Sequence, residues 1–258
     1  MTASGTHLVL IPSFNTGRKL VETIEAARSA WNPVWVVIDG SSDGSEQATL
    51  AMAERDPGLT VMIRAANGGK GAALYDGLKA AAAAGFTHVL TMDADGQHPP
   101  ERIGAFMAES KANPRAMVLG RPIFDASAPL ERLAGRRLAN LLARLASSFA
   151  DIGDCLCGFR VYPLSPLLAA MGRTRHMRGF DFDPEAAIRL AQAGLPIINL
   201  PAEIRYFRPA EGGVSHFRYW RDNLVLAHMY LRLVGSSLIA RRRAHRIDIG
   251  VRAEAGRR

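Results

Sequence analysis

The stretch "HVLTMDADGQHPP" (88–100) decides the fold, because an apolar run of about strand length ends directly in two carboxylates, Asp93 and Asp95. The run has no alternating polar positions, which is typical of a strand buried on both faces. Two prolines follow, and proline is tolerated in the first turn of a helix. The sequence therefore predicts a buried strand with acidic side chains at its carboxyl end, followed by a helix at 99–110.

The same alternation of apolar runs and helical periodicity recurs along the first half of the chain. Continuous apolar strands separated by helices predict an α/β fold with a mostly parallel central sheet flanked by helices. In such sheets ligands bind beyond the carboxyl ends of the strands. We expect strands at 7–12, 34–39, 59–63, 88–93, 116–121 and 196–200, and helices at 17–30, 45–56, 71–85, 99–110, 131–149 and 184–193.

The second half is less regular. The stretches 153–163 and 175–183 are expected to be loops, and 217–240 is a long amphipathic segment. No linker-like composition divides the chain, so one large domain is favoured. The expected organisation is a domain at 1–238, with a donor-binding half at about 7–122 and an acceptor-side half at about 123–238, and a disordered basic tail at 239–258.

Composition and charge restrict the class of protein. The chain has 258 residues, of which 48% are hydrophobic and 22% charged, so it can bury a full globular core. The net charge is +8, and the tail at 239–258 carries seven arginines against two acidic residues. A basic tail favours an acidic partner, either nucleic acid or an anionic membrane surface. A solvated end without a partner is the alternative.

Other features favour a cytoplasmic protein. The N-terminus lacks the pattern of a secretory signal, and no uninterrupted apolar segment reaches the roughly 20 residues that a membrane-spanning helix needs. Cys155 and Cys157 are too few for a zinc site and too close for an ordinary disulfide. We interpret them as reduced thiols.

Two loops of the first half could bind a nucleotide. "RAANGGKGAAL" (64–74) lacks the spacing of a Walker A loop, but Lys70 and glycine amides at a helix start form a plausible anion site. Asp39 ends a strand and precedes a Gly/Ser turn. Its carboxylate could accept hydrogen bonds from a base or ribose, or it could only stabilise the turn.

Three interpretations of Asp93 and Asp95 compete. An EF-hand loop is excluded, because its sixth and twelfth positions would be His98 and Gly104 instead of Gly and Glu. An acidic turn remains possible. The third interpretation is a clamp for Mg²⁺ or Mn²⁺, in which Gln97 continues the two-residue step and offers an amide oxygen.

Four motifs, in this order and spacing, carry a family resemblance: "IPSFN" (11–15), "VVIDGSSDGS" (36–45), "NGGKGAAL" (67–74) and "MDADGQHPP" (92–100). Together they resemble the family-2 inverting glycosyltransferases with the GT-A fold, and among these the polyprenyl-phosphate (dolichol-phosphate-type) sugar transferases. The resemblance covers about residues 7–235. The later motifs "DCLCGFRVYP", "FDFDPEAAIRLAQAG" and "GGVSHFRYWRDN" resemble a bacterial subgroup found with aryl-polyene lipid pathways.

The resemblance implies a UDP- or GDP-sugar donor and a Mg²⁺ or Mn²⁺ cofactor. Two departures stand out: Ile38 replaces the first of a common aspartate pair, and the "QxxRW" signature of polymer-forming members is absent. The implied metal ligands are Asp93, Asp95 and Gln97. The implied donor-binding residues are Pro12, Ser13, Asn15, Asp39, Ser41, Asn67, Lys70, Asp93 and Ala94.

The nature of the acceptor determines the remaining roles. A lipid phosphate is already an anion and needs cations instead of a base. Arg208, Ser215 and His216 stand where the lipid-phosphate transferases carry an Arg and a Ser-Lys pair, with His216 in place of the lysine. A hydroxyl acceptor would need a carboxylate base, from Asp154, Asp181 or Asp183, with a slight preference for Asp154. The expected catalytic residues are Asp95, Asp154, Arg160 and Asp183.

The predicted function is metal-dependent, inverting sugar transfer from a nucleoside-diphosphate-sugar to a lipid or lipid-linked acceptor. The enzyme would sit at the inner face of the membrane and contact anionic lipid through 217–240 and the tail. One alternative is a nucleotidyltransferase acting on a sugar phosphate. Another is a nucleic-acid-binding protein that uses the arginine tail, which would leave the aspartates at the strand end unexplained. We expect no nucleic-acid partner.

Overall fold

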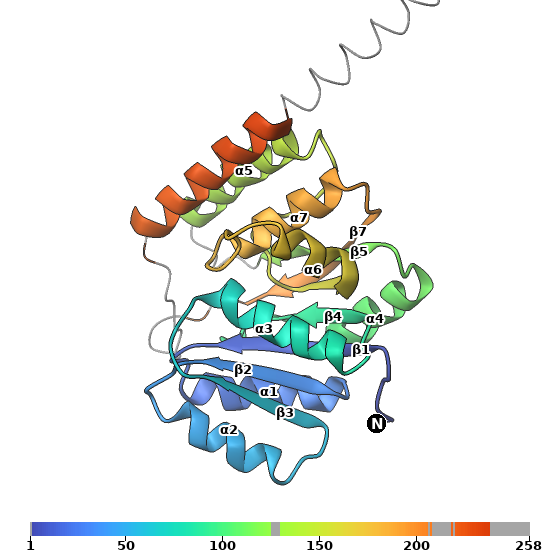
Figure 1. Cartoon of the computed structure of the whole chain (residues 1–258), viewed down its shortest axis with the longest axis vertical. Coiled ribbons are helices and arrows are strands. Elements are labelled where there is room, and N and C mark those ends of the chain that lie inside the picture. Colours follow the sequence, from blue (N-terminus) through green and yellow to red (C-terminus); the bar gives the residue numbers. More distant parts are fainter. Residues whose placement is uncertain (1, 125–129, 206, 208–217, 219, 238–258) are drawn as a thin grey trace, which may run out of the picture.

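A seven-stranded sheet forms the centre of the protein (Figure 1). The computed structural model describes residues 2–124, 130–205, 207, 218 and 220–237. The strand order is β3-β2-β1-β4-β6-β5-β7, and every neighbouring pair is parallel except the two that involve β6. The strands are β1 His7–Ser13, β2 Val34–Asp39, β3 Leu59–Arg64, β4 His88–Thr91, β5 Met117–Phe124, β6 Arg160–Pro163 and β7 Ile197–Ile204.

Helices cover both faces of this sheet (Figure 1). One core packs α3, α5, α6 and α7 against one face, and a second core packs α1 and α4 against the other. The helices are α1 Arg18–Ala30, α2 Ser45–Ala53, α3 Lys70–Ala83, α4 Ile103–Ala112 (preceded by the 3₁₀ turn η1 Pro100–Arg102), α5 Leu130–Ala146, α6 Leu164–Gly172 and α7 Phe182–Gln192, and 220–237 is helical too.

The mostly parallel α/β fold predicted from the apolar runs is confirmed. The prediction of a loop throughout 153–163 was wrong, because its last four residues form β6, antiparallel to both β4 and β5. The pattern was missed because Arg160 is a charged residue with no exposed surface. The fourth strand ends at Thr91, two residues earlier than predicted.

The antiparallel direction of β6 has a consequence for the ligand edge of the sheet. The parallel strands β1, β2 and β4 bring their carboxyl ends to that edge, whereas β6 brings its first residue there. Arg160 accordingly lies opposite Thr91 in the sheet register. A basic side chain therefore lies beside the strand end from which the two aspartates follow.

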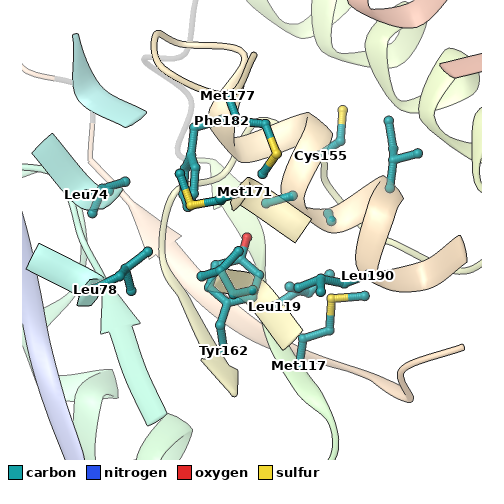
Figure 2. Packing of buried hydrophobic residues seen from close by; sticks show 14 of the residues in the cluster. Leu74, Leu78, Met117, Leu119, Cys155, Tyr162, Met171, Met177, Phe182 and Leu190 are labelled. Atoms are coloured by element: carbon teal, nitrogen blue, oxygen red, sulfur yellow. The ribbon is translucent and has the colours of Figure 1, made fainter. Parts of the chain in front are cut away.

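The larger core holds this edge in place. Figure 2 shows Tyr162 between leucines of α3 and side chains of α6 and α7. Tyr162 and Phe182 meet edge to face at 6.3 Å between ring centroids, which ties β6 to the start of α7. Cys155 and Cys157 are free thiols, both buried. Among the helices described, none has both the length and the apolar character needed to cross a bilayer.

Gly77 lets α3 lie close to the sheet. A Cβ atom at Gly77 would come within 2.8 Å of Leu10 Cδ1 and 2.9 Å of Val37 Cγ2, and both of these side chains are fully buried. We expect Gly77→Ala to lower the free energy of unfolding by about 1–3 kcal/mol, as overpacking does in a close-packed core. Urea denaturation followed by circular dichroism measures this change.

The matched control is Gly104→Ala. Gly104 also lies within a helix, but a Cβ there meets nothing within 4 Å. Removing a helical glycine in open space should raise stability by up to ~1 kcal/mol. If both variants shift stability in the same direction, α3 does not depend on this close approach.

Candidate active site

A lysine whose side chain is only 12% exposed lies at the centre of the charged cluster at the ligand edge. Lys70 is the first residue of α3, and its Nζ is 2.6 Å from Asp93 Oδ1 and 2.6 Å from Asp183 Oδ2. Asp93 follows β4, and Asp183 belongs to the first turn of α7. One ammonium group thus joins three elements that are distant in the sequence.

The opposite charges of Lys70, Asp93 and Asp183 stabilise one another in their ionised forms. Burial by itself would lower the pKa of Lys70, but the Asp183 and Asp93 carboxylates outweigh it and raise that pKa. Burial would likewise raise the pKa of Asp93, but the positive charge of Lys70 lowers it. Lys70 therefore carries its charge at neutral pH, and Asp93 is ionised.

Gly158 leaves room for the triad. A Cβ there would lie 2.9 Å from Lys70 Nζ and 3.1 and 3.2 Å from the two Asp93 carboxylate oxygens. Thr91 donates a hydrogen bond from Oγ1 to the Gly158 carbonyl at 2.9 Å and so fixes the loop at this distance. Sequence reasoning did not single out Gly158, because its role depends on a contact across 65 positions that no local motif encodes.

Asp95 lies next to the triad, half-buried. The backbone N–H of Gln97 donates to Asp95 Oδ1 at 3.0 Å, which turns the chain after β4. Burial, and then the negative charge of Asp93, raise the pKa of Asp95 to about 7. Because burial and a neighbouring negative charge both disfavour the ionised form of Asp95, a cation bound beside it would stabilise that form.

His98 stabilises the same turn. Its Nδ1 accepts a hydrogen bond from the Asp93 backbone N–H at 2.9 Å, and its Nε2 is 3.8 Å from Asp93 Oδ2. Burial lowers the pKa of His98, so the ring is neutral and its proton is on Nε2. This agrees with a role in the turn.

The cluster fits a hard divalent cation whose ligand set the protein completes only in part. The ammonium of Lys70 already occupies a cation position between two carboxylates, and Asp93, Asp95 and Gln97 offer oxygen atoms of the kind that Mg²⁺ and Mn²⁺ prefer. Within the described part of the chain, no three His, Cys, Asp or Glu side chains gather as a complete metal site. The remaining ligands would have to come from substrate and water.

Asp39 holds the glycine-rich loop that precedes α3. It is 2% exposed and accepts hydrogen bonds from the Arg64 guanidinium and from the backbone N–H groups of Gly68 and Gly69, the latter at 2.8 Å. The loop also lies directly on Gly40, where a Cβ would come within 2.6 Å of the Asn67 nitrogen. Arg64, which was not among the predicted site residues, completes this arrangement.

The predicted donor-binding residues surround the same edge. Asn15 joins the turns after β1 and β2, since its N–H donates to Ser41 Oγ at 3.0 Å and its Oδ1 accepts from the Ser42 N–H at 2.7 Å. Asn67 Oδ1 accepts from the Gly69 N–H at 3.0 Å. Pro12 and Ser13 end β1, where Ser13 bonds Thr16, and the Ala94 carbonyl accepts from Thr23 at 3.2 Å.

Arg160 is completely buried and organises the acceptor side of the cluster. It donates to the Tyr162 hydroxyl at 2.8 Å, to the Asp154 carbonyl at 3.1 Å and to the Asp183 carbonyl. Its Nε has no hydrogen-bond partner, and neither does Asp183 Oδ1. Arg160 therefore fixes the backbone beside the cluster, and Asp183 keeps one buried oxygen available.

Asp154, the slightly preferred base, is held on both oxygens. Its Oδ1 accepts from Arg136 at 2.6 Å and from the N–H groups of Leu156 and Cys157, and Asn140 donates to its Oδ2 at 3.3 Å. Asp181, another candidate base, accepts from the N–H groups of its own loop at 2.9 Å. The predicted acceptor-binding residues Arg208, Ser215 and His216 lie outside the described residues.

Comparison with known proteins identifies the family. A model of "Glycosyl transferase family 2" matches residues 8–168. The chain is 26% identical to undecaprenyl-phosphate mannosyltransferase from Micrococcus luteus, over 75% of this chain and 81% of that protein. It is 27% identical to polyprenol monophosphomannose synthase from Mycolicibacterium smegmatis, over 81% of this chain and 79% of that protein.

A third relative is more similar in sequence and longer. It is the undecaprenyl-phosphate 4-deoxy-4-formamido-L-arabinose transferase of Salmonella choleraesuis, 31% identical over 67% of this chain and 53% of that protein. Among solved structures, glucosyl-3-phosphoglycerate synthase from Mycobacterium tuberculosis with Mn²⁺, UDP-glucose and phosphoglyceric acid aligns with a TM-score of 0.61 at 17% identity, covering 90% of this chain and 80% of that one.

The fold is therefore GT-A, an α/β sheet with its ligand edge at the carboxyl ends of the parallel strands. The chain belongs to glycosyltransferase family 2 and is related to the polyprenyl-phosphate sugar transferases.

Lys70 should contribute substantially to the free energy of unfolding of the ligand-free protein. Lys70→Met leaves Asp93 and Asp183 without their shared cation, and we expect the free energy of unfolding to fall by roughly 3 kcal/mol. Lys79→Met, on the same helix, breaks a pair with Asp76 in which Lys79 is 53% exposed, and should change stability by less than ~1 kcal/mol. Equal unfolding curves for the two variants would refute the central role of Lys70.

Proposed function

We propose that this glycosyltransferase moves a sugar from a UDP- or GDP-sugar to a polyprenyl-phosphate-type lipid, with Mg²⁺ or Mn²⁺ and with inversion at the anomeric carbon. The observation that carries the proposal is the cluster of Lys70, Asp93, Asp95 and Asp183 at the ligand edge of a GT-A sheet. Two relatives whose names specify undecaprenyl phosphate, and one named for polyprenol monophosphomannose, support the class of acceptor.

The donor site follows from the loops at this edge. Asp39 holds the glycine loop in front of α3, and this loop leads into Lys70, the cation of the charged cluster near which the diphosphate would bind. Asn15 and Ser41 fix the neighbouring turns, which would line the nucleoside. A divalent cation held by Asp93, Asp95 and Gln97 would offset the charge that develops on the diphosphate leaving group.

The hydrogen bonds that engage Asp154 favour a phosphate acceptor over a hydroxyl acceptor. Asp154 accepts three hydrogen bonds on Oδ1 and one, from Asn140 at 3.3 Å, on Oδ2, so its carboxylate is engaged in holding the loop at 154–157. A lipid phosphate needs no base, because it attacks as an anion. Arg208, Ser215 and His216 are proposed to bind that phosphate. For a hydroxyl acceptor, Asp183 with its unpartnered Oδ1 would be the better base.

A lipid acceptor implies work at a membrane surface. We propose a peripheral enzyme at the inner face of the membrane, with the arginines of 239–258 attracted to anionic lipid. The motifs at 154–163, 180–194 and 212–223 favour an acceptor like that of the aryl-polyene subgroup.

Asp95 should be required for metal-dependent donor binding. With Mn²⁺ present, a nucleoside diphosphate should raise the melting temperature of the wild type, because a ligand that binds only the folded state stabilises it. We expect Asp95→Ala to lose that shift and to lower transfer to polyprenyl phosphate by 100-fold or more. Asp151→Ala, which removes a carboxylate that is 76% exposed, is the control and should behave as wild type.

The assay uses a panel of UDP- and GDP-sugars with polyprenyl phosphate, and mass spectrometry detects the glycosylated lipid. If the wild type transfers from none of these donors while Asp95→Ala binds nucleotide equally well, the proposed function is wrong. A wild type that glycosylates only hydroxyl acceptors would instead refute the phosphate assignment.

A further inference from the structure

Helix α5 buries alanines and leaves three of its leucines exposed. Ala143 and Ala146 are buried against the core, whereas Leu138, Leu141 and Leu145 are 59%, 54% and 40% exposed. At 100° per residue the three leucines form one stripe, on a face nearly opposite the buried alanines. A helix whose only neighbour was the protein core would show the reverse arrangement.

The helix at 220–237 repeats this arrangement. Met229, Tyr230 and Leu233 face the core, of which all three are part. Trp220, Leu224 and Leu231 are 79%, 70% and 76% exposed and recur at helical spacing on the other side. The sequence prediction placed Trp220 and Leu224 in one amphipathic segment with these core residues, and the structure separates the two faces.

The two helices are neighbours (Figure 1). Ser148, just after α5, lies 3.4 Å from Ser237 between hydroxyl oxygens. The Tyr230 hydroxyl is 3.3 Å from Cys155 Sγ, and Arg232 is paired with the fully buried Glu185 of α7. Each stripe lies on the side of its helix that faces away from the core. We call the exposed residues of the two stripes, Leu138, Leu141, Leu145, Trp220, Leu224 and Leu231, the leucine platform.

We propose that the leucine platform docks on the surface of an anionic lipid bilayer. Its charge supports a lipid occupant: Arg137, Arg144 and Arg221 are exposed on these helices, and the one acidic residue described in 133–149 or 220–237, Asp222, is partly buried and accepts a hydrogen bond from the Arg218 N–H. Aliphatic side chains, a tryptophan and an excess of arginines are the composition of an interfacial helix. The arginine tail begins directly after the second helix.

The platform is connected to the candidate active site. Arg136 and Asn140, on α5, hold the Asp154 carboxylate, and Asn140 also accepts from the Cys155 N–H at 2.8 Å. This loop continues to Gly158, which lies against Lys70 and Asp93. A lipid-docked α5 would therefore present the site to an acceptor carried in the same bilayer. The choice of lipid rests in part on the proposed function, but docking can be tested without turnover.

The experiment measures co-sedimentation of the full chain with vesicles of phosphatidylglycerol and phosphatidylethanolamine. We expect the double variant Leu138→Ser/Leu141→Ser to partition about tenfold more weakly than the wild type, because two exposed leucines no longer enter the interface. Ile63→Ser removes an apolar side chain that is 45% exposed on β3, away from the platform, and should partition as wild type. Vesicles that contain brominated lipid should quench the fluorescence of Trp220 in the wild type.

Two further measurements identify other occupants. Light scattering without vesicles gives the mass, and a dimer that becomes monomeric in Leu138→Ser/Leu141→Ser would overturn the proposal in favour of a second copy of the chain. Equal sedimentation of the double variant and the wild type, with loss only on deletion of 239–258, would overturn it in favour of the tail alone. The Mn²⁺-dependent melting shift with nucleoside diphosphate should be the same in the double variant as in the wild type, so failure of docking and failure of the proposed function are distinguishable.

Discussion

The ammonium group of Lys70 is the interaction on which the ligand edge of this protein depends. It lies 2.6 Å from a carboxylate oxygen of Asp93 and 2.6 Å from one of Asp183, and these residues come from the turn after β4 and from α7. Two carboxylates this close to each other would repel without a cation between them. The lysine therefore holds the turn after β4 and the start of α7 together. Because one ammonium faces two carboxylates, the triad keeps a negative charge that a bound cation would offset.

The backbone around this triad is fixed by buried charged groups. Arg160 is fully buried and binds the carbonyls of Asp154 and Asp183, while Asp39 binds the glycine loop in front of α3. Both are charged residues used as scaffolding, which is affordable only because each has several partners. Such preorganisation suits a reaction in which the protein mainly positions the donor and acceptor.

The proposed phosphate acceptor fits both the hydrogen bonding of Asp154 and the exposed leucines of α5. A phosphate acceptor needs cations and no base, and Asp154 is engaged on both oxygens. The same carboxylate connects the site to α5, whose leucines face outward. An engaged Asp154 and exposed leucines on α5 would both suit the proposed acceptor, an anion embedded in lipid.

The sequence by itself determined the fold and which ends of its strands carry polar side chains. Continuous apolar runs predicted the buried parallel strands, and their polar ends predicted where Asp39, Asp93 and Asp95 would gather, because parallel strands bring their carboxyl ends to one edge. These are local patterns, so a sequence encodes them directly. Four ordered motifs added the family, which a match over residues 8–168 confirms.

Only the tertiary structure decided which of these groups meet. The pairing of Lys70 with Asp183 spans 113 positions, and the contact of Gly158 with Asp93 depends on β6 running antiparallel beside β4. The exposure of the leucines of α5 could not be predicted from the sequence either. Helical periodicity gives the spacing of an apolar stripe but not whether that stripe faces the core. Long-range contacts and the direction of a helix face follow from how the elements pack, and packing is a property of the whole chain.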